Sequence, residues 1–361
     1  MTGRTHATGV SAGLGPERVA AVDSQDMRCR IEGFPGDLVE AAGRAARFAP
    51  ALEGRRAGAV AVLGMGGSAI GGDLVAAVTL DRRRIPLDVV RGYELPAWID
   101  GDVQIVASSY SGDTEETLSA YEAAKSRGLA AVVITTGGRL RERAETHGDP
   151  VLLLPPGYPP RAALGHSYAA CAIVVAALAT GLDVGEEADA IAEAGEAMRA
   201  LPAEWLADDP KNPALGVARE AVAALPLVYA GHPVAIAAAR RWRTQLNENA
   251  KLLAFTCEFP EHNHNEIVGF ETDPVVPSAV FYLETAWDDP RIRRRMDIVR
   301  RQLGRRTVSQ RRVEAGGGSP LEAMLRLCLL GDCGSFLASV ITGRDPTPVA
   351  SIDALKSELS R

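Results

Sequence analysis

The stretch V-L-G-M-G-G-S-A-I-G-G-D, from Val62 to Asp73, joins an apolar run to five glycines and the start of a helical pattern. A strand that turns through glycines into a helix brings backbone N–H groups and the positive end of the helix to one point. The stretch therefore predicts an anion-binding turn at the end of a buried strand. Two anions fit it, the pyrophosphate of a dinucleotide and the single phosphate of a smaller molecule.

The dinucleotide alternative rests on a glycine fingerprint. Gly64, Gly66 and Ala69 satisfy the pattern G-x-G-x-x-A. A dinucleotide-binding fold then places an acidic residue about twenty residues further on, at the end of the second strand. Asp88 stands near that distance, but inside the predicted strand Leu87–Arg91. The fingerprint alone leaves both ligands open.

A second strand-to-helix turn favours the smaller ligand. It reads V-A-S-S-Y-S-G-D-T-E-E-T, from Val106 to Thr117, and gathers three hydroxyl side chains around a glycine. Short hydroxyls and free N–H groups suit the oxygens of one terminal phosphate. The two turns together predict a phosphate-binding site formed by Gly66, Gly67, Ser68, Ser109, Ser111 and Thr114. Asp113 and Glu116 have the spacing of a capping box, and we expect them to cap the following helix.

Short β-rich runs alternate with helical patterns through the first half of the chain. The runs are Val60–Met65, Leu87–Arg91, Val103–Ser109, Ala130–Thr135 and Val151–Leu154. This alternation is typical of βαβ units in a doubly wound parallel sheet. After the segment 182–213 the pattern restarts with a strand at 225–230, a glycine turn and a helix to about Lys251.

The sequence therefore predicts an α/β protein with two doubly wound parallel-sheet domains in tandem. We expect a flexible N-terminus at 1–20 and a first, phosphate-binding domain at 21–185. A helical connector at 186–213 would then lead into a second domain at 214–361.

Composition excludes several classes of partner. A net charge of −7 and 5% aromatic residues argue against nucleic acid, and we interpret the arginine-rich run 291–306 as the solvated face of a helix. Five cysteines without a C-x-x-C pair indicate reduced thiols. Residues 1–16 lack a signal-peptide pattern, and the apolar run 169–179 is too short to span a bilayer. We expect a cytoplasmic protein that binds neither nucleic acid nor membrane.

Further motifs carry a resemblance to a known family. They are I-T-T-G-G-R-L (134–140), P-P-R-A-A-L (159–164), N-E-N-A-K (247–251), P-E-H-N-H-N (260–265) and S-I-D-A-L-K (351–356). With the two glycine turns, they make residues 22–361 similar to the bifunctional phosphoglucose/phosphomannose isomerase family of the phosphoglucose isomerase superfamily. The resemblance implies two sugar isomerase (SIS) domains of flavodoxin-like fold, a phosphosugar substrate, no redox cofactor and no metal.

The same resemblance implies four catalytic residues. Glu248 would be the base that moves a proton between C1 and C2 of the sugar, and Arg161 would stabilise the enediolate. His264 would open the sugar ring, reaching in from the neighbouring subunit of a homodimer. Lys356 would assist ring opening from a C-terminal segment that folds back over the site.

The residues themselves also allow plainer interpretations. Glu248 reads as an exposed helix residue paired with Lys251, and Arg161 reads as a surface residue. His262 and His264 form the pattern H-x-H, which also occurs in metal sites, but no third ligand accompanies it. We expect His262 to serve as scaffold.

The predicted activity is the interconversion of fructose 6-phosphate with glucose 6-phosphate, mannose 6-phosphate or both. The resemblance associates mannose acceptance with a Thr seven residues before the C-terminal Lys. That position is Val349 here, and Thr347 stands two residues earlier, so the aldose range is left open. A non-catalytic phosphosugar sensor and an isomerase of an amino- or deoxysugar phosphate are the alternatives.

Overall fold

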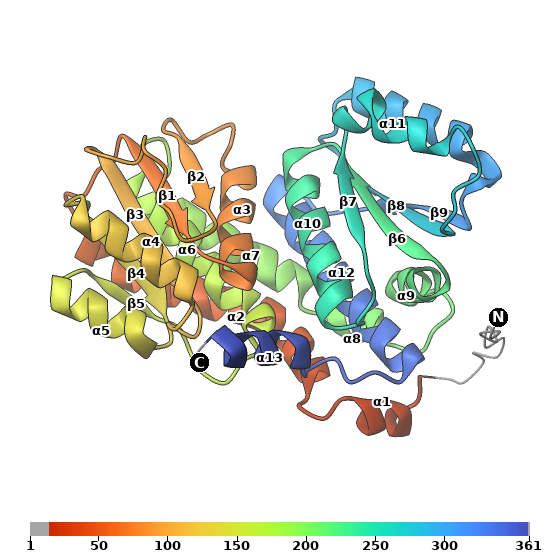
Figure 1. The fold of residues 1–361 in the computed structure, drawn as a ribbon, viewed down its shortest axis with the longest axis horizontal. Helices are drawn as coiled ribbons and strands as arrows, with labels where there is room; N and C mark the ends of the chain where they lie inside the picture. The colour runs from red at the N-terminus through yellow and green to blue at the C-terminus, as the bar shows by residue number, and fades with distance from the viewer. Residues whose placement is uncertain (1–13, 360–361) are drawn as a thin grey trace.

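A five-stranded parallel sheet carries both glycine turns. In the computed structural model, which describes residues 14–359, its strands lie in the order β2-β1-β3-β4-β5 (Figure 1). The strands are β1 (Ala59–Leu63), β2 (Leu87–Val90), β3 (Val103–Ser109), β4 (Ala131–Thr135) and β5 (Val151–Leu153). This is the flavodoxin-type order, whereas the dinucleotide-binding sheet has the order 3-2-1-4-5-6. The topology therefore differs from the one that the glycine fingerprint would require for a dinucleotide.

Helices cover both faces of this sheet. They are α2 (Met27–Phe48), α3 (Gly66–Val78), α4 (Glu115–Ser126), α5 (Gly138–His147) and α6 (Leu164–Leu178). Successive residues of a strand point to opposite faces. Val60 and Val62 accordingly pack with α2, α3 and α6, while Ala61 and Leu63 pack with α4 and α5.

A second parallel sheet repeats the topology of the first without its fifth strand. Its order is β7-β6-β8-β9, from β6 (Leu225–Ala230), β7 (Phe255–Glu258), β8 (Ser278–Glu284) and β9 (Ser309–Glu314). One face packs with α9 (Pro213–Ala223), α10 (Pro233–Glu248) and α12 (Pro320–Thr342), and the other packs with α11 (Pro290–Leu303). Helix α10 follows β6 as α3 follows β1. The predicted fold of two doubly wound α/β sheets in tandem is confirmed.

The two sheets share a hydrophobic core. One cluster of buried side chains includes Val62 of the first sheet and Val228 of the second, and α12 lies within it. Helix α12 is long and apolar enough to cross a membrane, but 89% of its most apolar window is buried inside the protein. It is therefore the central helix of this shared core, packed against helices of both halves.

The described parts of the segments that we expected to lie outside the two domains are largely helical and partly buried. The segment 186–213 lies in α7 (Val184–Met198), α8 (Leu201–Trp205) and the turn before α9, and Ile191 and Trp205 are buried. Helix α1 (Pro16–Val22) begins inside the segment 1–20 that we expected to be flexible. The backbone N–H of Leu14 donates to Asp208 at 2.8 Å, so the chain is anchored there; residues 1–13 lie outside the described residues.

Two local interpretations are confirmed. In α11, Met296, Val299 and Leu303 are buried, while its arginines are exposed apart from the half-buried Arg300. The arginine-rich run is thus a solvated helix face. All five cysteines are free, and three of them are buried in the core.

Candidate active site

The two predicted phosphate-binding turns lie side by side at the carboxyl edge of the first sheet. Strands β1 and β3 are parallel neighbours, with Leu63 opposite Ala107. The Oγ of Ser68, in the first turn, accepts a hydrogen bond from the backbone N–H of Tyr110 in the second turn, at 3.2 Å. The hydroxyls of Ser109 and Thr114 lie 2.9 Å apart, and Ser111 is exposed at the edge. The structure therefore brings the predicted group together.

The helices that follow these turns begin without side-chain caps. Neither Met65, at the start of α3, nor Thr114, at the start of α4, caps its helix with a side chain. The expected capping box of Asp113 and Glu116 is wrong, because α4 begins one residue later than that pattern requires. The Asp113 carboxylate instead accepts from the backbone N–H of Arg139, at 3.1 Å. Uncapped first-turn amides suit an anion.

A glycine brings the first turn into contact with Arg161. Arg161 lies in the short 3₁₀ helix η2 (Pro160–Ala162), which follows β5. A Cβ added to Gly67 would lie 2.9 Å from the carbonyl oxygen of Pro160 and 3.4 Å from Cα of Arg161. Only a residue without a side chain permits this approach, so the predicted phosphate site and Arg161 are immediate neighbours.

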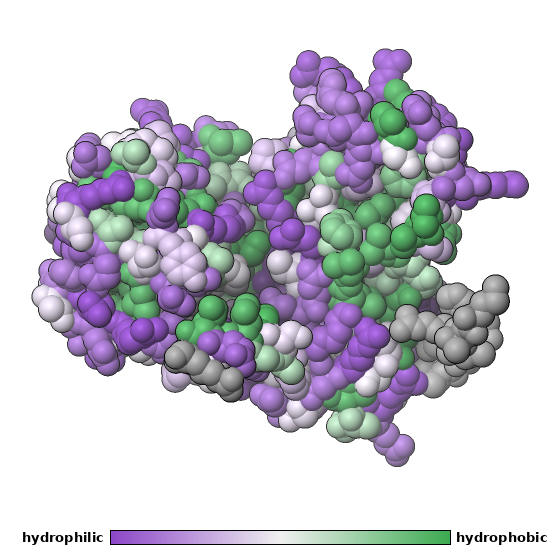
Figure 2. All heavy atoms as spheres, viewed as in Figure 1, coloured by the Kyte–Doolittle hydropathy of each residue, from purple (hydrophilic) through white to green (hydrophobic). Residues whose placement is uncertain are grey.

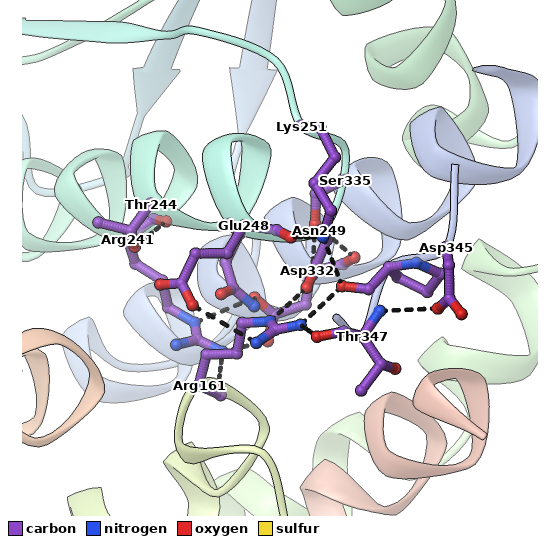
Figure 3. A network of polar contacts seen from close by, with 12 residues as sticks. Arg161, Arg241, Thr244, Glu248, Asn249, Lys251, Asp332, Ser335, Asp345 and Thr347 are labelled. Carbon is purple, nitrogen blue, oxygen red and sulfur yellow. Dashed lines mark hydrogen bonds and ion pairs between the residues drawn. The ribbon is translucent and has the colours of Figure 1, made fainter. Parts of the chain in front are cut away.

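The Arg161 side chain is buried and held by the second half of the molecule (Figure 3). Its Nε donates to Oδ1 of Asn249 at 2.7 Å, and its Nη2 donates to the carbonyl oxygens of Pro346 and Thr347 at 2.6 and 2.8 Å. A guanidinium has five N–H donors, so these bonds use three and leave the two on Nη1. Nη1 lies 3.4 Å from Oε2 of Glu248. The interpretation of Arg161 as a surface residue is wrong.

A buried ion pair between Arg241 and Asp332 holds the main chain of Arg161. Nη2 of Arg241 donates to the carbonyl oxygen of Arg161 at 3.0 Å. The Asp332 carboxylate on α12 accepts from Arg241 at 2.6 and 3.0 Å and from Gln245 at 2.8 Å. Burial raises the pKa of Asp332, and the charge of Arg241 opposes that shift. Sequence reasoning missed this pair, although an Asp within the apolar stretch that forms α12 was a signal, since unpaired carboxylates are rarely buried.

Glu248 is the last residue of α10, and its side chain is 29% exposed. The alternative interpretation, an ion pair between the Glu248 carboxylate and Lys251, is wrong. Nζ of Lys251 donates instead to the carbonyl oxygens of Glu248 and Pro346. Lys251 has a positive φ of 57°, so the chain leaves α10 through a left-handed residue. Burial, reinforced by the charge of Arg161, lowers the pKa of Lys251.

His264 does not join this group within the described chain. It is exposed in the short 3₁₀ helix η3 (Glu261–His264), and among residues 14–359 no hydrogen bond or ion pair joins it to Arg161 or Glu248. His262 is fully buried, stacked on Phe259 with ring centroids 4.8 Å apart, and burial lowers its pKa. No cluster of three metal-ligating side chains is found in the described part of the chain.

Lys356 also lies apart from Arg161. It belongs to α13 (Ala350–Leu359), none of whose residues is buried. The helix exposes the apolar side chains of Ile352, Leu355 and Leu359. Figure 2 shows apolar surface in the region of α13. The preceding segment does reach the site, since Pro346 and Thr347 bind Arg161. Among the described residues, however, no hydrogen bond or ion pair joins Lys356 to Arg161 or Glu248.

Thr347 and Val349, the two residues that bear on the sugar preference, lie at or next to the contacts of Arg161. Thr347 turns its carbonyl toward Arg161 and its side chain away (Figure 3). Its hydroxyl is buried and has no hydrogen-bond partner among the described residues. Val349 is half-buried two residues later. The geometry leaves the aldose range open.

Comparison with known proteins identifies relatives of this chain. Residues 210–359 match the family described as "Bacterial phospho-glucose isomerase C-terminal SIS domain". The chain is 38% identical to a bifunctional phosphoglucose/phosphomannose isomerase of Caldicellulosiruptor bescii over 83% of this chain and 89% of the relative. It is 33% identical to the enzyme of the same name from Aquifex aeolicus, over 82% and 89%.

A solved structure supports the fold independently. Tagatose-6-phosphate ketose/aldose isomerase from Escherichia coli superimposes with a TM-score of 0.66 at 17% identity, covering 88% of this chain and 93% of the other. At this identity the likeness concerns the fold alone. The identity to the two relatives over most of the chain shows that this chain belongs to the bifunctional phosphoglucose/phosphomannose isomerase family, and the family model over residues 210–359 agrees.

Proposed function

We propose that this protein is an aldose–ketose isomerase that interconverts fructose 6-phosphate with glucose 6-phosphate, mannose 6-phosphate or both, through a cis-enediolate. One observation carries the proposal: the main chain of Arg161 packs beside Gly67 of the predicted phosphate-binding turn, and Nη1 of Arg161 faces Glu248. A residue whose main chain adjoins a phosphate site and whose cation faces a carboxylate base is suited to a substrate with its phosphate at one end and its reacting carbons at the other. The names of the relatives support the same substrates.

The chemistry assigns a role to each end of this arrangement. The amides of Gly66 and Gly67 and the hydroxyls of Ser68, Ser109, Ser111 and Thr114 would bind the phosphate. The Glu248 carboxylate would take the proton from one of the carbons C1 and C2 and return it to the other. The negative charge that develops on oxygen in between would be stabilised by Nη1 of Arg161, which is already desolvated and held in place.

Ring opening requires a proton to leave the C1 hydroxyl and a proton to reach the ring oxygen. We assign this step to His264, donated by the partner subunit of a homodimer, with help from Lys356. Two observations support a dimer: His264 is exposed, and α13 exposes apolar side chains along its length. A ten-residue helix with no buried residue is marginal by itself in water, so a covering surface would stabilise α13. We place the enzyme in the cytoplasm, which the free cysteines support.

The first experiment tests the reaction. Purified protein is incubated with fructose 6-phosphate and a chelator, and glucose 6-phosphate and mannose 6-phosphate are measured separately by coupled assays. Turnover to either product supports the proposal, and the ratio of the two products determines the aldose range. Thermal stabilisation by the sugar phosphates without turnover would favour a sensor. Turnover confined to amino- or deoxysugar phosphates, assayed in parallel, would favour the modified substrate.

The second experiment tests donation of His264 across the interface. Glu248→Gln and His264→Ala chains are co-produced with different tags, so that mixed dimers form. If each site combines Glu248 of one subunit with His264 of the other, each mixed dimer has one intact site. A statistical mixture should then recover about a quarter of wild-type activity from two inactive variants. If both residues act within one chain, the mixture stays inactive.

A further inference from the structure

Tyr110 connects four loops at the carboxyl edge of the first sheet. It stands between Ser109 and Ser111 of the second phosphate-binding turn and is 7% exposed. Its N–H donates to Ser68 in the turn after β1, at 3.2 Å. Its carbonyl oxygen accepts from the N–H and the hydroxyl of Thr136, after β4, at 3.0 and 2.8 Å.

The tyrosine hydroxyl makes the third connection, to the loop after β5. It donates to the carbonyl oxygen of Pro155 at 2.7 Å and accepts from the backbone N–H of Tyr158 at 3.0 Å. Residues 155–158 form no backbone–backbone hydrogen bond to another described residue. Among the described residues, both hydrogen bonds made by the main chain of this segment are therefore with the Tyr110 hydroxyl.

The segment 155–158 leads directly to Arg161. The two residues between Tyr158 and Arg161 are Pro159 and Pro160, and they restrict the backbone because proline fixes φ near −65°. The displacement of Tyr158 would therefore be passed on to η2, whose first residue already touches Gly67. The Tyr158 side chain does not replace this anchor, since its hydroxyl binds Asp37 of α2 at 3.2 Å, on the side of the helix layer.

We propose that Tyr110 is a positioning residue that fixes Arg161 relative to the bound phosphate. Its backbone belongs to the phosphate-binding turn, and its hydroxyl holds the segment that carries Arg161. The Tyr110 hydroxyl thus links the predicted phosphate-binding turn to the segment that leads to Arg161, in addition to the contacts that hold Arg161 from the second half. This inference rests on the proposed function, in which the two turns bind phosphate and Arg161 stabilises the enediolate.

The test removes one oxygen atom. Tyr110→Phe keeps the buried ring and deletes both hydrogen bonds to residues 155–158. Tyr121→Phe is the matched control: Tyr121 lies in α4 of the same half, is fully buried, and donates its hydroxyl to Asp149 at 2.6 Å, away from these loops. With fructose 6-phosphate, kcat of Tyr110→Phe should fall by about ten- to a hundredfold while KM changes less than about twofold. Tyr121→Phe should keep the wild-type kcat.

Two kinetic results would overturn the inference. A kcat of Tyr110→Phe within about twofold of wild type would show that the hydroxyl does not position Arg161. A higher KM with unchanged kcat would place the effect in phosphate binding alone. Either result, with an active wild-type enzyme, leaves the proposed isomerase activity intact.

Hydrogen–deuterium exchange supplies a readout that does not depend on turnover. In Tyr110→Phe, peptides covering 155–164 should exchange faster than in wild type and in Tyr121→Phe, with α4 as the internal reference. Fructose 6-phosphate should slow their exchange in wild type more than in the variant, because the variant uncouples the two loops. Unchanged exchange in these peptides would overturn the inference even if the wild-type protein proved inactive.

Discussion

The carbonyl oxygen of Arg161 lies 3.0 Å from Nη2 of Arg241, and the two arginines belong to different halves of the molecule. The second half thus holds both ends of Arg161, its main chain through Arg241 and its side chain through Asn249. Burial and the charge of Arg241 lower the pKa of Arg161, and Asp332 balances the Arg241 charge with two hydrogen bonds. The arrangement of the site depends on contacts between the halves more than on either sheet alone.

Removal of the Asp332 carboxylate should destabilise the whole protein. In Asp332→Ala, Arg241 would remain buried without a counter-charge, which costs about 3 to 5 kcal/mol of the free energy of unfolding. Urea unfolding measures this difference. The control is Asp297→Ala, which removes an exposed partner of Arg300 at 3.8 Å and should cost about 0 to 1 kcal/mol. Equal losses in the two variants would contradict the role of the buried pair.

Removal of the Glu248 charge should separate binding from turnover. Glu248→Gln keeps the shape of the side chain but cannot accept a proton, so kcat should fall by about 10²- to 10⁴-fold. Fructose 6-phosphate should still raise the melting temperature of the variant. Glu258→Gln is the control, because Glu258 pairs with Arg240 on an exposed part of β7. If Glu248→Gln kept wild-type turnover, another group would be the base.

A methyl group at Gly67 should separate the phosphate turn from Arg161. Its Cβ would lie 2.9 Å from the Pro160 carbonyl oxygen, closer than a carbon and an oxygen normally approach. Since main chain meets main chain here, we expect Gly67→Ala both to raise KM and to lower kcat. Gly36→Ala is the control: its Cβ meets nothing within 4 Å inside α2, and alanine there should stabilise the helix by about 0.5 to 1 kcal/mol. Normal kinetics in Gly67→Ala would contradict the contact.

The acid sensitivity of folding should depend on His262. Burial lowers the pKa of His262 in the folded state, so the unfolded chain binds its proton more readily. Below the unfolded pKa of about 6.5, stability should therefore fall as the pH falls, by up to about 1.4 kcal/mol per pH unit. Urea unfolding of wild type and His262→Gln between pH 5 and 7.5 would compare these slopes. The variant should show the shallower slope, and identical slopes would contradict the assignment.

The position of the two glycine turns at one sheet edge could be predicted because their signals are local. Glycines and hydroxyls at Gly66–Ser68 and Ser109–Thr114 follow apolar strands, and parallel pairing places such turns at one edge. The alternation of short β-rich runs with helical patterns is also a local signal, and it predicted the two parallel sheets. Asp113 shows the limit of local signals: α4 begins one residue later than the capping pattern implies, and a neighbouring loop supplies Asp113 with a partner, Arg139.

The surroundings of Arg161 could not be predicted from the residues alone. Its partners Asn249 and Thr347 lie 88 and 186 residues away in the sequence, so no spacing rule connects them. The family motifs pointed to Arg161 and Glu248 but contained no information on the pair of Arg241 and Asp332 that supports them. The motifs placed Lys356 near the site, and the structure of one chain leaves it on an exposed helix.

Helices α3 and α10 occupy equivalent places after the first strand of each sheet and pack against each other. The start of α3 and the end of α10 both lie beside Arg161, so the two helices bring opposite partial charges to its surroundings. A pseudo-two-fold relationship would generate a second, inverted anion site at the start of α10. There Pro233 lacks an N–H, and the side chain of His232 accepts from Val234 at 3.4 Å. The two repeated halves therefore differ at this place, because a side chain caps the start of α10 and none caps the start of α3.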